Sequence, residues 1–110
     1  MKADKRIVCI NGVPVFTEKE SIECDTAAMK IHTGSTGLCG GDRWEGGRTY
    51  ISIENAGETD MIVTLNKGKD GNGKGFEIAA SGDDALVALS YAFAAISAKL
   101  LNTMTGEEEE

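Results

Sequence analysis

The chain has 110 residues, of which 41% are hydrophobic and 26% charged, and its formal net charge is −7. These values exclude a disordered chain, and the length allows one domain with a single core but not two. Four of the acids form the terminal run at residues 107–110, which leaves −3 on the rest of the chain and no lysine- and arginine-rich stripe. We therefore expect a single domain over residues 1–105, an acidic disordered tail at 106–110, and no direct binding of nucleic acid.

The cysteines and the apolar segments predict the compartment. Cys9, Cys24 and Cys39 are odd in number with no CxxC spacing, and the charged N-terminal segment does not have the form of a signal peptide. The longest uncharged apolar segment, residues 85–98, is shorter than the roughly 20 residues that cross a bilayer. The sequence thus predicts a soluble, cytoplasmic protein with reduced thiols and no membrane contact.

Residues 7–16 predict the first β-hairpin. Asn11 and Gly12 suit the positive φ values of a two-residue primed turn, and β-forming residues flank them on both sides. Pro14 has no N–H to donate, so its strand is expected at an edge or a bulge. The pairing places two sets of side chains on opposite faces, Val8, Ile10, Val13 and Val15 on one and Ile7, Cys9, Pro14 and Phe16 on the other.

Four further strands are predicted before the C-terminal third. Residues 21–25 and 29–33 alternate weakly, with Ile22, Cys24, Met29 and Ile31 as the inward side chains. Residues 49–54 and 61–66 alternate more clearly, and the turn-forming segment NAGETD between them predicts an antiparallel pair.

Residues 75–80 predict the last strand, and a helix follows it. The strand comes after the glycine-rich segment KGKDGNGKG and is expected to pair with residues 61–66. The helix is capped by Ser81 or Asp83 and runs to about Met104. The predicted fold class is therefore α+β, an antiparallel sheet of five or six strands with one long C-terminal helix packed on one face.

The predicted helix is apolar on nearly all sides. One face carries a seam of large residues and a neighbouring face a strip of alanines, while only Ser90 and Ser97 form a polar line. A sheet cannot bury such a helix from one side alone. Either the sheet curls around the helix, or a second copy covers it. We expect a homo-oligomer formed through this helix, in which the alanine strip allows two helices to approach closely. The seam comprises Leu86, Leu89, Phe93, Ile96 and Leu100, and the strip Ala85, Ala88, Ala92 and Ala95.

The candidate site lies in residues 34–47, which contain six glycines and the only tryptophan. If residues 49–54 and 61–66 pair, this loop and the loop at 67–74 emerge at the same end of the sheet. Glycine-freed backbone amides and cationic side chains suit an anion, and an indole can stack on a flat ring. The leading interpretation is non-catalytic binding of a small anionic, nucleotide-like ligand, with no cofactor and no metal, by Gly40, Gly41, Arg43, Trp44, Arg48, Lys67 and Lys69.

Two other classes of function stay open. The first is an acidic protein-interaction or inhibitor module of the phage accessory type, which acts through a sheet edge and the tail. The second is a cysteine-dependent enzyme, because Cys39, His32 and Asp42 supply a thiolate, a base and an orienting group. The phosphate-loop and EF-hand patterns are incomplete, since GSTGLCGG lacks the following lysine and KDGNG lacks the flanking carboxylates.

Overall fold

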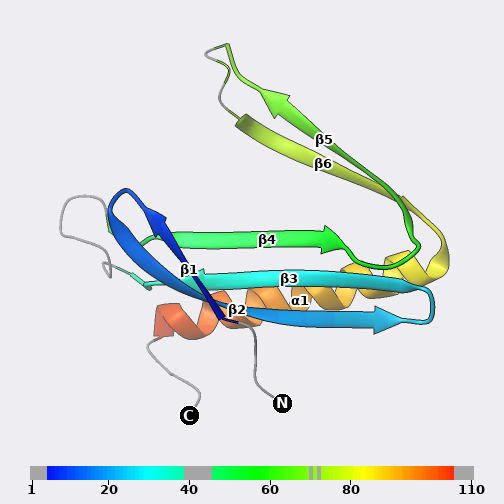
Figure 1. The fold of residues 1–110 in the computed structure, drawn as a ribbon, viewed down its shortest axis with the longest axis horizontal. Helices are drawn as coiled ribbons and strands as arrows, with labels where there is room; N and C mark the ends of the chain where they lie inside the picture. The colour runs from blue at the N-terminus through cyan, green and yellow to red at the C-terminus, as the bar shows by residue number, and fades with distance from the viewer. Residues whose placement is uncertain (1–4, 39–45, 70, 72, 106–110) are drawn as a thin grey trace.

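The computed structural model describes residues 5–38, 46–69, 71 and 73–105 of the chain. The acidic tail at 106–110 lies outside these residues. The described residues form six strands and one helix (Figure 1), in the order β1 (Lys5–Ile10), β2 (Val13–Cys24), β3 (Ala27–Ser35), β4 (Thr49–Asn55), β5 (Asp60–Lys67), β6 (Gly73–Ser81) and α1 (Asp83–Thr105).

The α+β class is confirmed, but the strands form two sheets instead of one. Strands β1 to β4 make an antiparallel sheet in sequence order, and β5 pairs with β6 in a separate two-stranded sheet. The predicted pairing of residues 49–54 with 61–66 is therefore wrong. β4 pairs with β3, with Ile53 opposite Ile31, and β5 pairs with β6, with Val63 opposite Ile78.

The connection between β4 and β5 gives the reason. The amide of Ala56 donates to the carbonyl oxygen of Ala28 at 2.8 Å, and the amide of Glu58 donates to that of Thr26 at 2.9 Å. The side-chain amide of Asn55 donates to the carbonyl oxygen of Thr59 at 2.7 Å. These bonds satisfy the backbone of the connection against the β2–β3 turn. The chain does not reverse onto β4, and the β5–β6 hairpin rises away from the larger sheet (Figure 1).

The first hairpin forms as predicted. Asn11 and Gly12 have φ values of 49° and 81°, and the register places Val8 opposite Val15. Val15 is fully buried, whereas Phe16 on the opposite face is 68% exposed. Pairing of β2 with β3 begins only at Glu18, so the part of β2 that contains Pro14 pairs with β1 alone. Pro14 therefore lies at an edge, as predicted.

The core lies between α1 and strands β2 and β3. Its buried side chains come from β3 and from the small-residue side of the helix. Ile22 and Cys24 of β2 pack against its margin, which confirms the inward side chains predicted for these two strands. The fully or nearly fully buried members are Ala27, Met29, Ile31, Ala88, Ala92 and Ile96.

The molecule is open for its size. Its radius of gyration is 15.4 Å, whereas a compact domain of this length has about 13 Å. The divergence of the β5–β6 hairpin from the larger sheet is visible in Figure 1. This separation decides which surfaces are available for binding.

Candidate functional site

Four of the predicted ligand contacts, Gly40, Gly41, Arg43 and Trp44, lie outside the described residues, as does Cys39. Their roles therefore stay predictions. His32, the proposed base for Cys39, is half-buried in β3 opposite Lys19 and Ser52. The remaining predicted contacts, Arg48, Lys67 and Lys69, are described and have quite different surroundings.

Arg48 is a buried residue that joins the β1–β2 turn to the start of β4, on the two edges of the larger sheet. Only 5% of it is exposed. Its Nε donates to the carbonyl oxygen of Ile10 at 3.1 Å, and its Nη1 to that of Gly46 at 2.8 Å. Its Nη2 lies 3.5 Å from the carbonyl oxygen of Asn11. The guanidinium thus holds the β1–β2 turn against the start of β4, and the sequence contains no local signal of this contact.

Lys67 and Lys69 lie at the tip of the β5–β6 hairpin and are exposed, as is Lys74 across the turn. Because β5 does not pair with β4, the tip does not share a sheet rim with the loop at 34–47. The connectivity on which the predicted site depended is therefore absent. The three lysines remain together as a cationic tip.

One face of the β5–β6 hairpin is entirely apolar and largely exposed. The register places Met61 opposite Ala80, Val63 opposite Ile78, and Leu65 opposite Phe76. Val63, Leu65 and Phe76 are 57%, 58% and 59% exposed, whereas Met61 and Ile78 are half-buried. We call this surface the hairpin face, and it comprises Met61, Val63, Leu65, Phe76, Ile78 and Ala80.

The side of α1 that points away from the sheet is also apolar. The alanine strip packs on the chain's own β3, so it is not available to a second helix as the sequence had suggested. Leu86, Tyr91 and Leu101 are 67%, 62% and 51% exposed. At 100° per residue, the exposed positions share one face, on which Asp83 of the first turn is the only charged side chain among the described residues. We call it the outer helix face, and it comprises Leu86, Val87, Ser90, Tyr91, Phe93, Ala94, Ser97, Ala98, Leu101 and Met104.

The same helix is long and apolar enough, by length and composition alone, to cross a membrane. It continues past Lys99 to Thr105 and has 23 residues, with a mean hydropathy of 1.5 over its most apolar stretch. The uncharged segment at residues 85–98 is the central part of this helix, and Lys99 ends it. One face of the helix nevertheless lies on the chain's own sheet, as in a core helix of a small soluble domain. Location in the cytoplasm stays a prediction.

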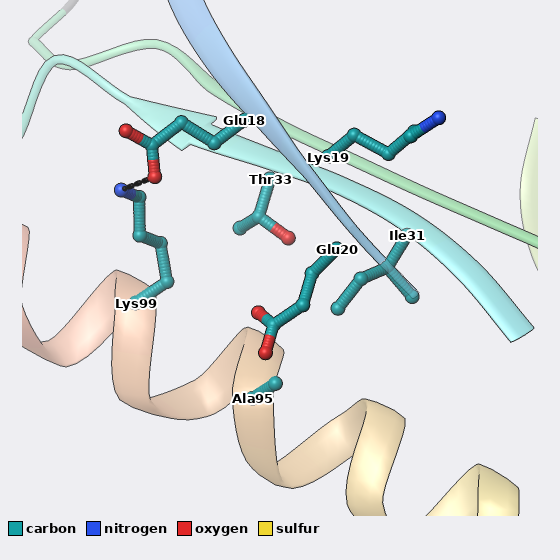
Figure 2. Close-up of a pocket in the computed structure, with 7 residues that line it drawn as sticks. All are labelled: Glu18, Lys19, Glu20, Ile31, Thr33, Ala95 and Lys99. Atoms are coloured by element: carbon teal, nitrogen blue, oxygen red, sulfur yellow. Dashed lines mark hydrogen bonds and ion pairs between the residues drawn. The ribbon is translucent and has the colours of Figure 1, made fainter. Parts of the chain in front are cut away.

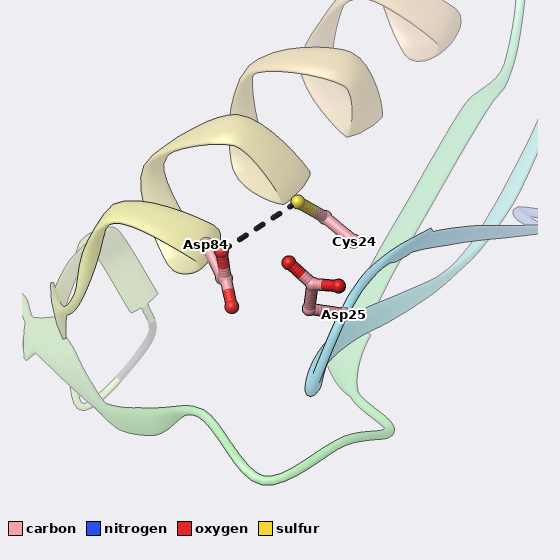
Figure 3. Close-up of side chains that lie close together, drawn as sticks. All are labelled: Cys24, Asp25 and Asp84. Carbon is pink, nitrogen blue, oxygen red and sulfur yellow. Dashed lines mark hydrogen bonds between the residues drawn. The ribbon is translucent and has the colours of Figure 1, made fainter.

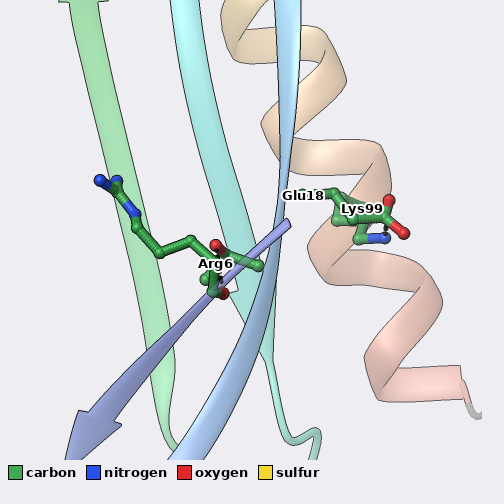
Figure 4. A network of polar contacts seen from close by, with 4 residues as sticks. Arg6, Glu18 and Lys99 are labelled. Carbon is green, nitrogen blue, oxygen red and sulfur yellow. Dashed lines mark hydrogen bonds and ion pairs between the residues drawn. The ribbon is translucent and has the colours of Figure 1, made fainter. Parts of the chain in front are cut away.

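A cavity of about 230 Å³ opens on the β2 side of the helix (Figure 2). Lys99 donates to Glu18 at 2.8 Å across it, joining the helix to β2. Thr33 is 4% exposed, and its Oγ1 has no hydrogen-bond partner in the described structure. Figure 4 shows the Lys99–Glu18 ion pair on the helix side of the sheet, with Arg6 directed toward β4. There Arg6 donates to the hydroxyl of Tyr50 at 3.4 Å.

A thiol and two carboxylates meet where β2 ends and α1 begins (Figure 3). The Sγ of Cys24 donates to Oδ1 of Asp84 at 3.8 Å, and ligand atoms of Cys24, Asp25 and Asp84 all lie within 4.8 Å of one another. Desolvation raises the pKa of the Cys24 thiol above 9.0, and the charges of Asp84 and Asp25 raise it further. Such acidic groups are common without an ion, and we assign the cluster no binding role.

Comparison of the chain with protein-family models, with curated proteins and with solved structures gives no match.

Proposed function

We propose that this protein is a non-catalytic protein-binding module whose binding surface comprises the hairpin face and the outer helix face. The supporting observation is the exposure of large apolar side chains on both surfaces, with Phe76 at 59% and Leu86 at 67%. Soluble domains rarely expose contiguous apolar surface of this kind unless another molecule covers it.

The chemistry of the two faces favours a protein as the partner. The charged side chains of the two faces lie at their ends, Lys67 at the hairpin tip and Asp83 in the first turn of α1. Each face otherwise contains aromatic and aliphatic residues of the type enriched at the centre of protein interfaces. Burying one such side chain contributes about 1.5–3 kcal/mol, so a few of them suffice for stable association. The amphipathic alternation of β5 and β6 also keeps the polar residues on the opposite side of the hairpin.

The experiment is native mass spectrometry with light scattering on the natively purified full chain. We expect each chain to be bound to another protein chain, either a second copy or a different protein. Replacing Val63 and Phe76 by serine should abolish this binding while the far-UV circular dichroism is unchanged. Ile62→Ser is the matched control, because Ile62 lies on the opposite face of the same strand and is 64% exposed. A chain that stays monomeric and binds no protein would contradict the proposal.

Binding of a small anionic ligand is a second candidate, supported by the exposed lysines of the hairpin tip. Lys67, Lys69 and Lys74 offer three ammonium groups at one turn. Calorimetry with mono- and dinucleotides should show binding that Lys67→Ala with Lys69→Ala weakens. No heat across the panel would reject it.

A further inference from the structure

We propose that the partner is a second copy of this chain, and that the two copies exchange hairpins, the hairpin face of each packing on the outer helix face of the other. This inference rests on the proposed function and specifies its partner. It predicts two equivalent contacts related by a twofold axis.

The chain cannot easily cover these faces itself. The outer helix face points away from the larger sheet, because Ala88, Ala92 and Ile96 on the other side of α1 are the residues buried against β3. The hydrogen bonds of Ala56 and Glu58 to the β2–β3 turn direct the hairpin away from β4 (Figure 1). If the hairpin instead closed onto β4, it would lie beside the larger sheet, on the side of the helix that the sheet already covers. Tyr91 and Leu101, on the other side of the helix, would stay exposed.

The two faces complement each other in structure and in charge. An apolar face of a sheet is stably covered by an apolar face of a helix, and each copy offers one of each. The nearby charged groups lie at the ends of the two faces, as Lys67 and Asp83 do, or are directed away from them. Lys99 pairs with Glu18 on the β2 side of the helix, and Asp60 and Glu77 lie on the opposite face of the hairpin. Between their ends both faces are uncharged, so a nucleic acid or a strongly charged peptide would find no opposite charge there.

The amount of exposed surface fits a stable dimer. Three large apolar side chains of the hairpin face and three of the outer helix face are each more than half exposed: Val63, Leu65, Phe76, Leu86, Tyr91 and Leu101. A stable interface buries about 800 Å² on each partner. The hairpin and the helix can provide this area together, and the exchange uses both faces of both copies.

Complementation between two variants tests the exchange. One variant carries Val63→Ser and Phe76→Ser on the hairpin, and the other carries Leu86→Ser and Tyr91→Ser on the helix. In a homodimer of either variant both contacts are damaged, whereas a mixed dimer keeps one contact intact. We expect each variant alone to be monomeric by light scattering, with a dissociation constant raised at least about 100-fold. The 1:1 mixture should form a dimer, and Ile62→Ser should stay dimeric alone.

Photo-cross-linking of the full chain gives a second measurement that does not depend on destabilising variants. A benzophenone side chain at position 76, in an equal mixture of ¹⁴N and ¹⁵N protein, should yield mixed-isotope cross-links to peptides that contain Tyr91 or Leu101. Cross-links within one isotope only would overturn the exchange. So would variants that fail to complement although each remains folded by circular dichroism.

The remaining outcomes separate this inference from the proposed function. A chain that forms a complex with a different protein and does not self-associate overturns the exchange but leaves the protein-binding module standing. A chain that stays monomeric, or that associates only with phosphatidylcholine vesicles through α1, overturns both.

Discussion

The Nε of Arg48 lies 3.1 Å from the carbonyl oxygen of Ile10, to which it donates a hydrogen bond across 38 residues of chain. This contact holds the β1–β2 hairpin against the residue that directly precedes β4. A buried guanidinium is stable only when its donors are satisfied, and the carbonyl oxygens of Ile10, Asn11 and Gly46 supply acceptors. The arginine therefore has a structural role at the end of the sheet where the sequence had suggested a ligand contact.

Replacing Arg48 by methionine should destabilise the fold. Methionine keeps the length and apolar body of the side chain but leaves the three carbonyl oxygens without its donors, at a cost of about 2–4 kcal/mol. Urea unfolding followed by circular dichroism measures this loss. Arg6→Met is the matched control, because Arg6 is exposed and contacts only Tyr50 through its side chain in the described structure, by a 3.4 Å hydrogen bond to the hydroxyl and from 5.9 Å above the ring. We expect a change below about 1 kcal/mol. Equal stability of the two variants would argue against the structural role.

Gly34 is expected to reject any side chain. A Cβ there would clash with the carbonyl oxygen of Phe16 and lie 2.9 Å from the Cα of Thr17, both backbone atoms of β2. Gly34→Ala should therefore cost about 1–3 kcal/mol in the free energy of unfolding. Gly75→Ala is the control, since the nearest atom to its Cβ is 4.0 Å away. Thermal unfolding should show a lower midpoint for the first variant alone.

The position of the core is tested by two apolar truncations. Met29 is fully buried between β3 and α1, whereas Ile62 is 64% exposed on the polar face of the hairpin. Met29→Ala should lower the free energy of unfolding by about 2–5 kcal/mol, and Ile62→Ala by less than about 0.5 kcal/mol. Urea titrations at one protein concentration make the comparison. Similar losses at both sites would place the hairpin's other face in contact with the core.

Local chemistry explains why the first hairpin and the helix were predictable. Asn11 and Gly12 adopt positive φ as a primed turn requires, and the turn then fixes the register that buries Val15 and exposes Phe16. The helix begins with Asp83 and Asp84, acids that suit its first turn. Each of these signals lies within a few residues of the structure that it determines.

The division into two sheets depends on contacts that the sequence does not display. The segment NAGETD has the composition of a reversing turn, yet the amides of Ala56 and Glu58 bond to Ala28 and Thr26, about 30 residues earlier. The sequence could not show which face of α1 packs on the sheet, because both the large-residue seam and the alanine strip are apolar. The alanines face β3, where their small side chains allow close approach. The structural role of Arg48 could not be predicted for the same reason, because its hydrogen-bond acceptor, the carbonyl oxygen of Ile10, is 38 residues away in the chain.

Alkylation of Cys24 should be slow and should accelerate when its acidic neighbours are neutralised. Only the thiolate reacts, and desolvation, with the charges of Asp84 and Asp25, raises the pKa of this thiol above 9.0. The rate of reaction with iodoacetamide should therefore be low at pH 7 and reach its midpoint above pH 9.0. Asp84→Asn should shift the midpoint to lower pH, and Asp25→Asn less so, because Asp84 acts more strongly on the thiol and also accepts its hydrogen bond. Asparagine tolerates the positive φ of 52° at position 25, so the second substitution should not strain the backbone. Peptide mass spectrometry resolves Cys24 from the exposed Cys9, which serves as the reference within the same chain. A midpoint that neither substitution moves would show that the carboxylates do not act on the thiol.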